Sequence, residues 1–509
     1  MSFLSIDIGT TGSKAVVFSD AGKILAEASG EYSVKSEQNG WFELDSFEVI
    51  QLCKKIIADA ASQVSQTDPV KAIGIASQGE AFTLLDKDDN YLSNAMVSFD
   101  IRSQKQVEKI CEVFGREKLY KITGHTAHTL FSLFKFQWIK ENQPEILEKA
   151  KRLLCFGDLL RYELTGRAII SYNLAARTML FDVSKKAWSD EILSEFGISK
   201  DILSEPAESG VSAGTIKKEI AEELNLSKDV IIATGGHDQC CGSIGAGVTG
   251  AGMAAYSIGT VACITPAFSQ CVLDETMMKS NLATYPYTIS GLYTTVAFCM
   301  TGGSGLKWFI DNLCECENKE ASQNGKNVYK QMLDAMPEEP TDLLVLPHLT
   351  STGTPYFDSS PLGAVLGVNL NTTKTELLKG LLEGITYEMK LNLGFLSKCG
   401  IKVTNLRAFG GGVRNEKWMQ IKADIFGLSI ECLEVREAGC MGAAVLAAKA
   451  AGDVGSVNEC CNEWVKVSKV YEPNKTRKAL YSQRYEVYEG LYETLVPIKN
   501  KINHCKWSK

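Results

Sequence analysis

The chain begins with short apolar runs separated by turns that contain glycine. Residues 2–18 form two runs rich in β-branched and aromatic side chains around Gly9-Thr10-Thr11-Gly12, and Ala21-Gly22-Lys23 leads into a third run at 24–29. Short apolar runs bounded by glycine are typical of strands joined by tight turns. We therefore expect two successive hairpins here.

Apolar side chains then recur with the spacing of one helix face. This periodicity predicts helices at 47–63, through most of 103–150, and at 158–164, 217–224, 302–336, 375–399, 415–426 and 437–452. Apolar runs at 70–76, 82–86, 229–234 and 407–409 predict strands between them. Strands interleaved with helices indicate an α/β fold. The charged, tyrosine-rich C-terminal part predicts a terminal amphipathic helix whose tyrosines pack against the protein.

Residues 239–273 contain no charged side chain and are long enough to span a bilayer. They also contain six glycines and Pro266, which disfavour a helix and favour tight turns. We therefore expect no membrane span here. The run also contains Ile258-Gly259-Thr260, which repeats Ile8-Gly9-Thr10 at half the chain length and suggests two related halves.

Composition excludes several classes of protein. The chain has 509 residues, 45% of them hydrophobic, which is ordinary for a folded protein, and its formal net charge is −8. That charge argues against nucleic acid or an anionic membrane as a partner. The sixteen cysteines are irregularly spaced and no leader follows Met1, so we expect reduced thiols in a cytoplasmic protein.

The first turn carries residues suited to phosphate. Its glycines let backbone N–H groups converge, the hydroxyls of Thr10 and Thr11 can donate hydrogen bonds, and the Asp7 carboxylate can hold Mg²⁺. An ordinary hairpin turn is the alternative.

A second group, Gly235-Gly236-His237-Asp238-Gln239, follows an apolar strand. A carboxylate at the mouth of a strand can take the proton of a substrate hydroxyl during phosphoryl transfer, and an unperturbed aspartate is ionised at neutral pH. Asp238 as the cap of a helix is the alternative.

Two further glycine clusters fit a nucleotide. Gly410-Gly411-Gly412 allows a flat ring to approach the backbone, with Asn415 capping the next helix, and Gly302-Gly303-Ser304-Gly305 opens a helix whose N-terminus attracts anions. The sequence contains neither GxxxxGK[ST] nor GxGxxG.

Two longer motifs carry a resemblance to a known family. They are Ser132-x-x-Lys135-Phe136-x-Trp138-Ile139-x-Glu141-Asn142, and Gly363-x-Val365-x-Gly367-Val368 followed by Glu376-Leu377 and Leu382-Glu383-Gly384. The chain resembles the FGGY carbohydrate kinases, with a xylulokinase-like pattern, from its first residues to about Gly452. Leu130 and Gly380 depart from the usual family residues.

The resemblance implies an α/β fold with two actin/hexokinase-like (ribonuclease H-like) domains flanking a central ATP and sugar cleft. It implies an N-terminal domain at 1–245 with the sugar and phosphate site, a C-terminal nucleotide domain at 246–455, and a helical extension at 456–509 packed on the second domain. ATP and Mg²⁺ are the implied co-substrate and metal, a sugar or polyol is the acceptor, and a homodimer is left open.

Roles follow by position. The resemblance implies Asp238 as catalytic base, Asp7 near the metal, and Gln78, Glu80, Asp100, Arg102, Asp238 and Gln239 at the sugar. It assigns to the nucleotide and its phosphates Thr10, Thr11, Lys14, Gly259, Thr260, Gly303, Lys307, Gly411, Gly412 and Asn415.

The acceptor is harder to assign. Gln78-Gly79-Glu80 stands where xylulokinases usually have Gln-Met-His and glycerol kinases Gln-Arg-Glu. Glu80, Asp100 and Asp238 are expected to line one pocket with few cations, which favours a neutral ketose. Kinases of the glycerol, erythritol, fuculose or gluconate type, with Arg177 binding an aldonate, and a non-catalytic sugar-binding regulator remain the alternatives.

Overall fold

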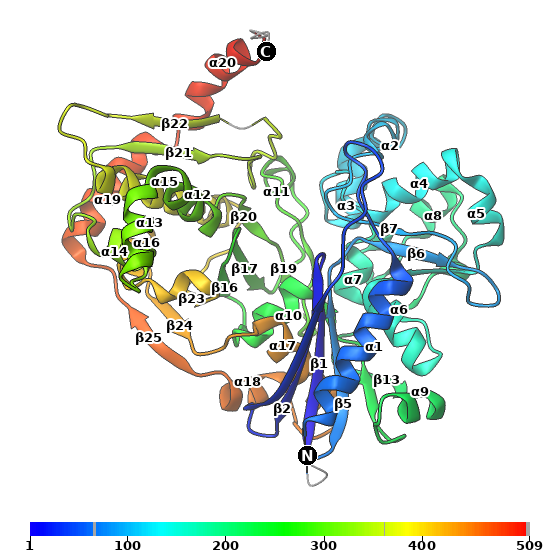
Figure 1. Ribbon diagram of the computed structural model, residues 1–509. Coiled ribbons are helices and arrows are strands. Elements are labelled where there is room, and N and C mark those ends of the chain that lie inside the picture. Colours follow the sequence, from blue (N-terminus) through cyan, green and yellow to red (C-terminus); the bar gives the residue numbers. More distant parts are fainter. Residues whose placement is uncertain (65–67, 361, 505–509) are drawn as a thin grey trace.

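The computed structural model describes residues 1–64, 68–360 and 362–504. Two mixed sheets, each covered by helices, form two lobes that stand side by side (Figure 1). The first sheet has seven strands in the order β13-β14-β5-β1-β2-β3, with β15 beside β5. Its strands are β1 (Ser2–Ile8), β2 (Gly12–Ser19), β3 (Ile24–Glu31), β5 (Val70–Ser77), β13 (Ser212–Thr215), β14 (Ile231–Ala233) and β15 (Gly236–His237).

The second sheet has eight strands in the order β18-β19-β17-β16-β23-β24-β25, with β20 beside β17. Its strands are β16 (Met253–Ile258), β17 (Ala262–Phe268), β18 (Tyr285–Pro286), β19 (Tyr293–Thr294), β20 (Ala297–Cys299), β23 (Asn405–Phe409), β24 (Ile430–Leu433) and β25 (Val467–Tyr471). The uncharged run therefore folds as most of α10 (Asp238–Gly245), the strands β16 and β17, and the turns around them. None of the helices among the described residues is long and apolar enough to cross a membrane.

The two sheets repeat one plan. In the first, β1 is antiparallel to β2 and parallel to β5, β5 is parallel to β14, and β14 is antiparallel to β13. In the second, β16, β17, β23, β24 and β25 repeat these relations in the same order. The short echo in the sequence therefore marks a repeated sheet topology, and the expected two-domain α/β fold is confirmed.

Helices of the first lobe follow the predicted periodicity. Helix α1 begins after Asp45, whose side chain accepts hydrogen bonds from the N–H groups of Phe47 and Glu48, and it buries the predicted apolar face. The helices are α1 (Ser46–Ser62), α2 (Gln104–Ile110), α3 (Arg116–Thr123), α4 (Ser132–Asn142), α5 (Pro144–Lys149), α6 (Phe156–Thr165), α7 (Tyr172–Ala176), α8 (Asp190–Phe196), α9 (Lys218–Glu223) and α10 (Asp238–Gly245), with a π-helical turn at Cys111–Gly115. Short strands accompany them: β4 (Glu43–Leu44), β6 (Phe82–Leu85), β7 (Ala95–Met96), β8 (Arg152–Cys155), β9 (Ile169–Ser171), β10 (Phe181–Asp182), β11 (Ala187–Trp188) and β12 (Glu205–Ala207).

The second lobe carries the remaining long helices and a separate hairpin. Its helices are α11 (Glu275–Lys279), α12 (Gly303–Leu313), α13 (Glu315–Gln323), α14 (Val328–Asp334), α15 (Lys374–Lys398) and α16 (Glu416–Phe426), and the hairpin pairs β21 (Leu344–His348) with β22 (Leu362–Leu366). The capping box of Thr373 and Glu376 starts α15.

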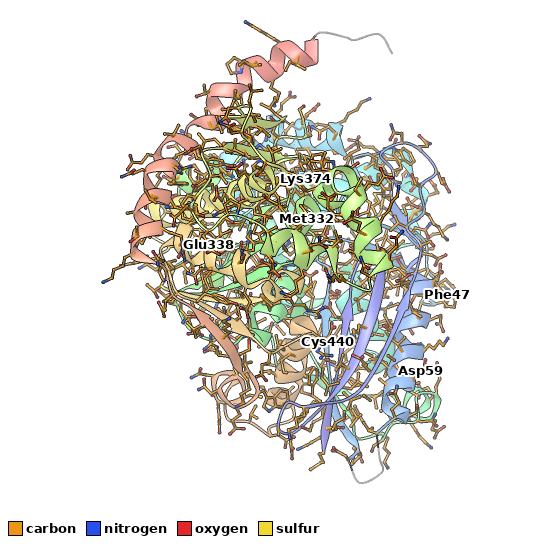
Figure 2. All side chains as sticks on the ribbon, turned by 60° about the vertical axis from the view of Figure 1, so that its left-hand side comes forward. Phe47, Asp59, Met332, Glu338, Lys374 and Cys440 are labelled. Atoms are coloured by element: carbon orange, nitrogen blue, oxygen red, sulfur yellow. The ribbon has the colours of Figure 1, made fainter. Side chains whose placement is uncertain are left out.

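One helix crosses the predicted domain boundary. Helix α17 (Ala438–Ala450) comes from the second half of the chain but packs against β1 and β5 of the first sheet and against α10. Figure 2 shows its Cys440 beside the N-terminal strands, far from Met332 and Lys374 of the second lobe. Its small residues permit this close packing. The division at 245/246 stays a prediction, with α17 packed across it on the first sheet.

The C-terminal segment also differs from its prediction. It contains α18 (Val457–Trp464), strand β25, α19 (Lys475–Tyr488) and α20 (Leu491–His504) instead of one helix. The Trp464 ring lies 5.8 Å from that of Phe3, so α18 packs on the first lobe. Tyr481 and Tyr488 are buried, which confirms that the tyrosines pack. Every cysteine that the structure describes is free.

Candidate active site

Five of the residues expected at the sugar or phosphates surround one cavity of about 280 Å³ at the end of the first sheet. They are Thr10, Gln78, Glu80, Asp238 and Gln239. Thr10 follows the β1 strand and the others follow β5 and β15, which pair side by side in register. Parallel strands that end at one edge therefore explain why residues far apart in sequence meet here.

Asp238 is the first residue of α10, directly after β15. Burial, followed by the negative charges of Asp7 and Glu80, raises its pKa to about 7. The expectation of an unperturbed aspartate is therefore wrong, because the site is less hydrated than a free side chain. A carboxyl group with a pKa near neutrality is suited to accept and release a proton.

His237 lies against this carboxyl group. Its Nε2 is 3.2 Å from Asp238 Oδ1, and its backbone N–H donates a hydrogen bond of 2.9 Å to Asn173 Oδ1. Burial holds the pKa of His237 well below its usual value, so the ring is neutral. The hydrogen bond to Asp238 Oδ1 comes from the Gln239 N–H, over 2.6 Å. The Asn173 contact fixes the turn that presents both side chains.

Arg177 brings a cation into the cavity. Its Nε and Nη2 donate hydrogen bonds to Oε1 of Glu80, the former over 2.5 Å. Both residues line the cavity with Asp238. The expected pocket of carboxylates with few cations is therefore corrected: Glu80 is paired.

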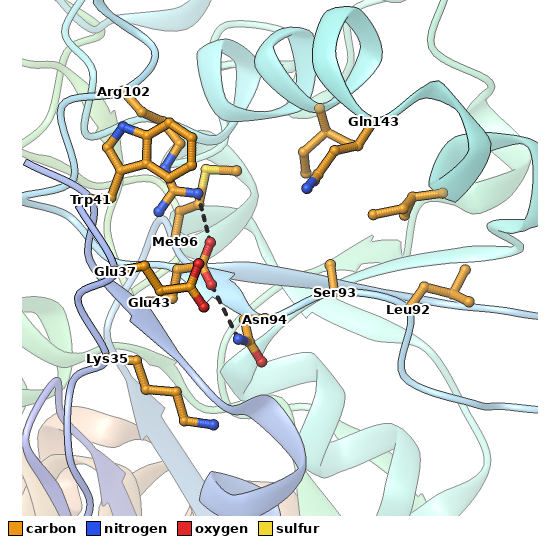
Figure 3. Close-up of a pocket in the computed structure, with 12 residues that line it drawn as sticks. Lys35, Glu37, Trp41, Glu43, Leu92, Ser93, Asn94, Met96, Arg102 and Gln143 are labelled. Carbon is orange, nitrogen blue, oxygen red and sulfur yellow. Dashed lines mark hydrogen bonds and ion pairs between the residues drawn. The ribbon is translucent and has the colours of Figure 1, made fainter.

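Asp100 and Arg102 do not line this cavity. Asp100 is fully buried, and its carboxylate accepts hydrogen bonds from the Phe42 N–H over 2.7 Å and from Arg102. Arg102 instead lines a separate cavity of about 270 Å³, where it stacks on Trp41 and donates to Glu43 over 2.6 Å (Figure 3). The expectation that these two residues contact the sugar is not met in this structure, because their charges satisfy each other within the first lobe.

The metal and phosphate candidates lie around the β1–β2 turn. Burial, followed by the charge of Glu437, raises the pKa of Asp7 to about 6. Lys14 donates to Glu437 over 2.8 Å and is also 3.1 Å from Glu27, while Thr11 is exposed at the turn.

A second cavity, of about 890 Å³, collects most of the residues expected to bind the nucleotide. Gly259, Thr260, Gly303, Gly411, Gly412 and Asn415 all line it. The turn after β16 and the N-terminus of α12 meet there, since the Gly303 N–H donates to Gly259 O over 2.8 Å. The N–H groups of Gly302 and Ser304 are paired as well, with Thr260 O, so the positive end of the α12 dipole is what favours an anionic group at this place.

Two of the nucleotide candidates, Asn415 and Lys307, differ in where their side chains lie. Asn415 caps α16 as predicted, with its Oδ1 accepting a hydrogen bond from the Trp418 N–H over 2.8 Å. Lys307 does not line the cavity; it is 67% exposed and pairs with Asp311 one helical turn away. The spacing along α12 places it on the solvent side.

We call the cavity of about 280 Å³ around Asp238 the sugar cavity, after the sugar candidates that line it. Sequence reasoning missed residues that reach this cavity from the second lobe. Asn281, Phe298 and Phe357 line it, and Tyr285 lies behind it with its ring 5.3 Å from that of His125. None of them belongs to a recognisable motif. We call the cavity of about 890 Å³ the nucleotide cavity, after the nucleotide candidates that line it. Glycine clusters pointed to it, but no pattern marked the side chains of Tyr329 and Trp418, which also line it.

Known proteins resemble this chain over nearly its whole length. The xylulose kinase of Bacillus subtilis (strain 168) is 29% identical over 490 residues, covering 96% of each chain. The glycerol kinase of Thermococcus gammatolerans is 30% identical over 491 residues, covering 94% of this chain and 95% of the relative.

Solved structures agree on the fold. A "xyloylose kinase" from Brucella ovis superposes with a TM-score of 0.88 at 25% identity, over 98% of this chain and all of that one. A gluconate kinase from Lactobacillus acidophilus superposes with a TM-score of 0.90 at 23% identity, over 98% of this chain and 99% of that one.

The family models match both lobes. The N-terminal domain model of the FGGY family of carbohydrate kinases matches residues 2–245, and the C-terminal domain model matches residues 254–451. The resemblance found in the sequence motifs is thereby confirmed. This chain belongs to the FGGY family of carbohydrate kinases, and it is a phosphotransferase that uses ATP.

Proposed function

We propose that this kinase transfers the γ-phosphoryl group of ATP to a hydroxyl of a neutral ketose. The xylulose kinases among its relatives support this proposal. The observation that carries the proposal is Asp238, a carboxyl group with its pKa near 7 in a cavity of sugar size, beside a Glu80 already paired with a cation. The cavity's fixed charges at Glu80 and Arg177 cancel. A neutral acceptor suits such a site.

In the proposed mechanism, Asp238 accepts the proton of the attacking hydroxyl as its oxygen approaches the phosphorus atom. The Gln239 N–H donates to Oδ1 of Asp238 over 2.6 Å, with His237 Nε2 3.2 Å from the same oxygen, which leaves Oδ2 for the substrate proton. Gln78 is less available to the sugar, because its Nε2 donates to Gly9 O over 3.0 Å and its Oε1 accepts from Thr10. Its side chain instead stabilises the β1–β2 turn that contains Gly9 and Thr10.

On the other side of the reaction, the chain binds the nucleotide in the larger cavity. The start of α12, at the positive end of its helix dipole, and the turn of Gly259 and Thr260 face the phosphates, and Gly411 and Gly412 leave room for the base. The first turn, with Thr10, faces the sugar cavity. Transfer takes place between these two turns.

The residues present fit Mg²⁺. Asp7 makes no side-chain hydrogen bond to any described residue, and burial, followed by the charge of Glu437, raises its pKa to about 6. No group of three or more His, Cys, Asp or Glu side chains among the described residues could hold a metal alone, which agrees with an ion held by one or two carboxylates, waters and phosphates. Asp7 would hold the ion with Asp238 nearby, and the ion would neutralise charge on the transferring phosphate.

Two observations bear on alternatives and location. Arg177 in the cavity favours a gluconate-type substrate as the second candidate, because a guanidinium binds a carboxylate. Use of ATP and the free, mostly buried cysteines support the proposal that the protein acts in the cytoplasm.

The test is ADP release from ATP and Mg²⁺ across D-xylulose, other neutral ketoses, glycerol and D-gluconate. We expect a neutral ketose to give the highest kcat/KM. If D-gluconate or glycerol gave the highest value, the assignment of a ketose would be wrong.

A further inference from the structure

The sugar cavity contains an arginine whose charge is occupied by a neighbouring acid. Arg177 and Glu80 are 15% and 6% exposed, and two nitrogens of the guanidinium share the single oxygen Oε1 of Glu80. The pair lies in the same cavity as Asp238. The cavity that faces the reactive carboxyl group therefore holds a cation that is already neutralised.

The structure fixes Arg177 in this place. Its guanidinium carbon lies 5.1 Å from the ring centre of Phe131 and 5.7 Å from that of Tyr285, so two aromatic rings flank it. Its stem crosses Gly79, where an added Cβ would lie only 3.1 Å from Arg177 Cγ. The absence of a side chain at Gly79 makes room for this arginine. Arg177 would consequently stay in the cavity if its acidic partner lost its charge.

Each partner also has an atom to spare. Among the described residues, neither Arg177 Nη1 nor Glu80 Oε2 has a hydrogen-bond partner, and neither is among the fully buried unpartnered atoms. Oε2 can accept a hydrogen bond from a sugar hydroxyl. A carboxylate ligand, in contrast, would seek two parallel hydrogen bonds from the guanidinium, and Glu80 already occupies its Nε–Nη2 edge.

We propose that Glu80 excludes carboxylate sugars from this active site by occupying Arg177, and that Arg177 is a latent carboxylate-binding residue. Specificity then depends on a repulsive element, the charge of Glu80, as well as on the attraction of Oε2 for hydroxyls. This inference rests on the proposed function, since it explains how the same site selects a neutral ketose.

The experiment compares Glu80→Gln with the natural protein on D-xylulose and D-gluconate. Glutamine keeps the shape of the side chain but leaves the arginine charge unbalanced. We expect kcat/KM for D-xylulose to fall roughly tenfold to a hundredfold, and that for D-gluconate to rise at least about tenfold. The ratio of the two values should thus shift about a hundredfold or more.

Two further variants make the outcome decisive. The double variant Glu80→Gln/Arg177→Met should lose the gain on D-gluconate. Glu431→Gln, which breaks the Arg407–Glu431 ion pair in the second lobe, should leave the ratio unchanged. Thermal unfolding checks that each variant is folded. A folded Glu80→Gln protein with no gain, or a gain that survives loss of Arg177, would overturn the proposal.

Calorimetric titration of D-gluconate without ATP separates this inference from the proposed function. If the natural protein phosphorylated no sugar, the proposed function would fail, yet tighter D-gluconate binding by Glu80→Gln would still support the role of Glu80. Equal affinity in both proteins would contradict it. Natural protein that prefers D-gluconate would overturn both.

Discussion

At the scale of single residues, the site depends on carboxyl groups whose protonation is altered by their surroundings. Asp238 has its pKa raised to about 7 by burial and by Asp7 and Glu80, and Asp7 has its pKa raised to about 6. Folding therefore places unfavourable charge at the reaction centre. Such an electrostatic cost is expected at a site that binds a cation and accepts a proton.

The first prediction concerns the role of Asp238. Asp238→Asn keeps the shape of the side chain but cannot accept the hydroxyl proton, so kcat should fall about a hundredfold or more. Nucleotide affinity, measured by calorimetry, should stay within about twofold, because the larger cavity is not lined by this residue. Asp86→Asn, in an exposed turn, is the control. Near-normal turnover would exclude Asp238 as the base.

The second prediction follows from the raised pKa. The pKa of Asp238 is about 7 in the folded protein and 3.8 in the unfolded chain. Ionisation of this group therefore costs no stability below about pH 4, and it lowers the free energy of unfolding as the pH rises from there towards about 7. Asp238→Asn should therefore unfold at the same temperature as the natural protein near pH 4, and roughly 1–4 °C higher at pH 8 without Mg²⁺.

Scanning calorimetry at both pH values measures this difference. Added Mg²⁺ should narrow it by stabilising the charged natural protein. An advantage of the variant that is equal at pH 4 and pH 8 would contradict the assigned cause.

At the scale of elements, the N-terminus of helix α17, from the second half of the chain, contacts Asp7 and Lys14 in the first half. A Cβ added at Gly439, in its first turn, would lie 2.3 Å from Asp7 Oδ2. Glu437, immediately before the helix, accepts a hydrogen bond from Lys14. The start of this helix therefore sets the position of the metal candidate.

The third prediction tests that contact. Gly439→Ala should displace the Asp7 carboxylate and raise the Mg²⁺ concentration needed for half-maximal activity roughly threefold to tenfold, with a smaller effect on the KM for sugar. Gly394→Ala is a matched control, because its added methyl group would meet only the Tyr485 hydroxyl at 3.7 Å. An unchanged Mg²⁺ requirement in Gly439→Ala would argue against Asp7 as the metal residue.

Elements were also what the sequence predicted best. The two hairpins, α1 and the glycine turns have strong local signals, so β1, β2 and β3 could be placed from the pattern alone, whereas most residues of the larger cavity were assigned through the family resemblance. Strand β25 could not, because its exposed residues in an edge strand lack the apolar run of a buried one. The distant partners of Arg102 and Arg177, Glu43 and Glu80, could not be predicted either, because these pairs depend on tertiary contacts that no local spacing encodes.

At the scale of the whole molecule, the sugar cavity draws residues from both lobes. Glu80 and Asp238 come from the first lobe, and Phe298 and Phe357 from the second. The nucleotide cavity lies mainly on the second lobe. A change in the angle between the lobes would alter the distance between the two substrates.

The fourth prediction is that the lobes close on their ligands. Excluding water from the cleft would protect ATP from hydrolysis before the sugar binds. Small-angle X-ray scattering should therefore show a smaller radius of gyration with D-xylulose and a non-hydrolysable ATP analogue together than with either alone. The same radius under all conditions would count against closure.

The central claim is that this chain moves one phosphoryl group from ATP to a neutral ketose. The most direct measurement is ³¹P nuclear magnetic resonance of a reaction containing the protein, ATP, Mg²⁺ and D-xylulose, with ADP measured in parallel. We predict equal amounts of ADP and a sugar phosphate ester, and no sugar phosphate with Asp238→Asn in the same time. ADP accompanied only by inorganic phosphate, or no consumption of ATP with D-xylulose or any other neutral ketose, would contradict the account.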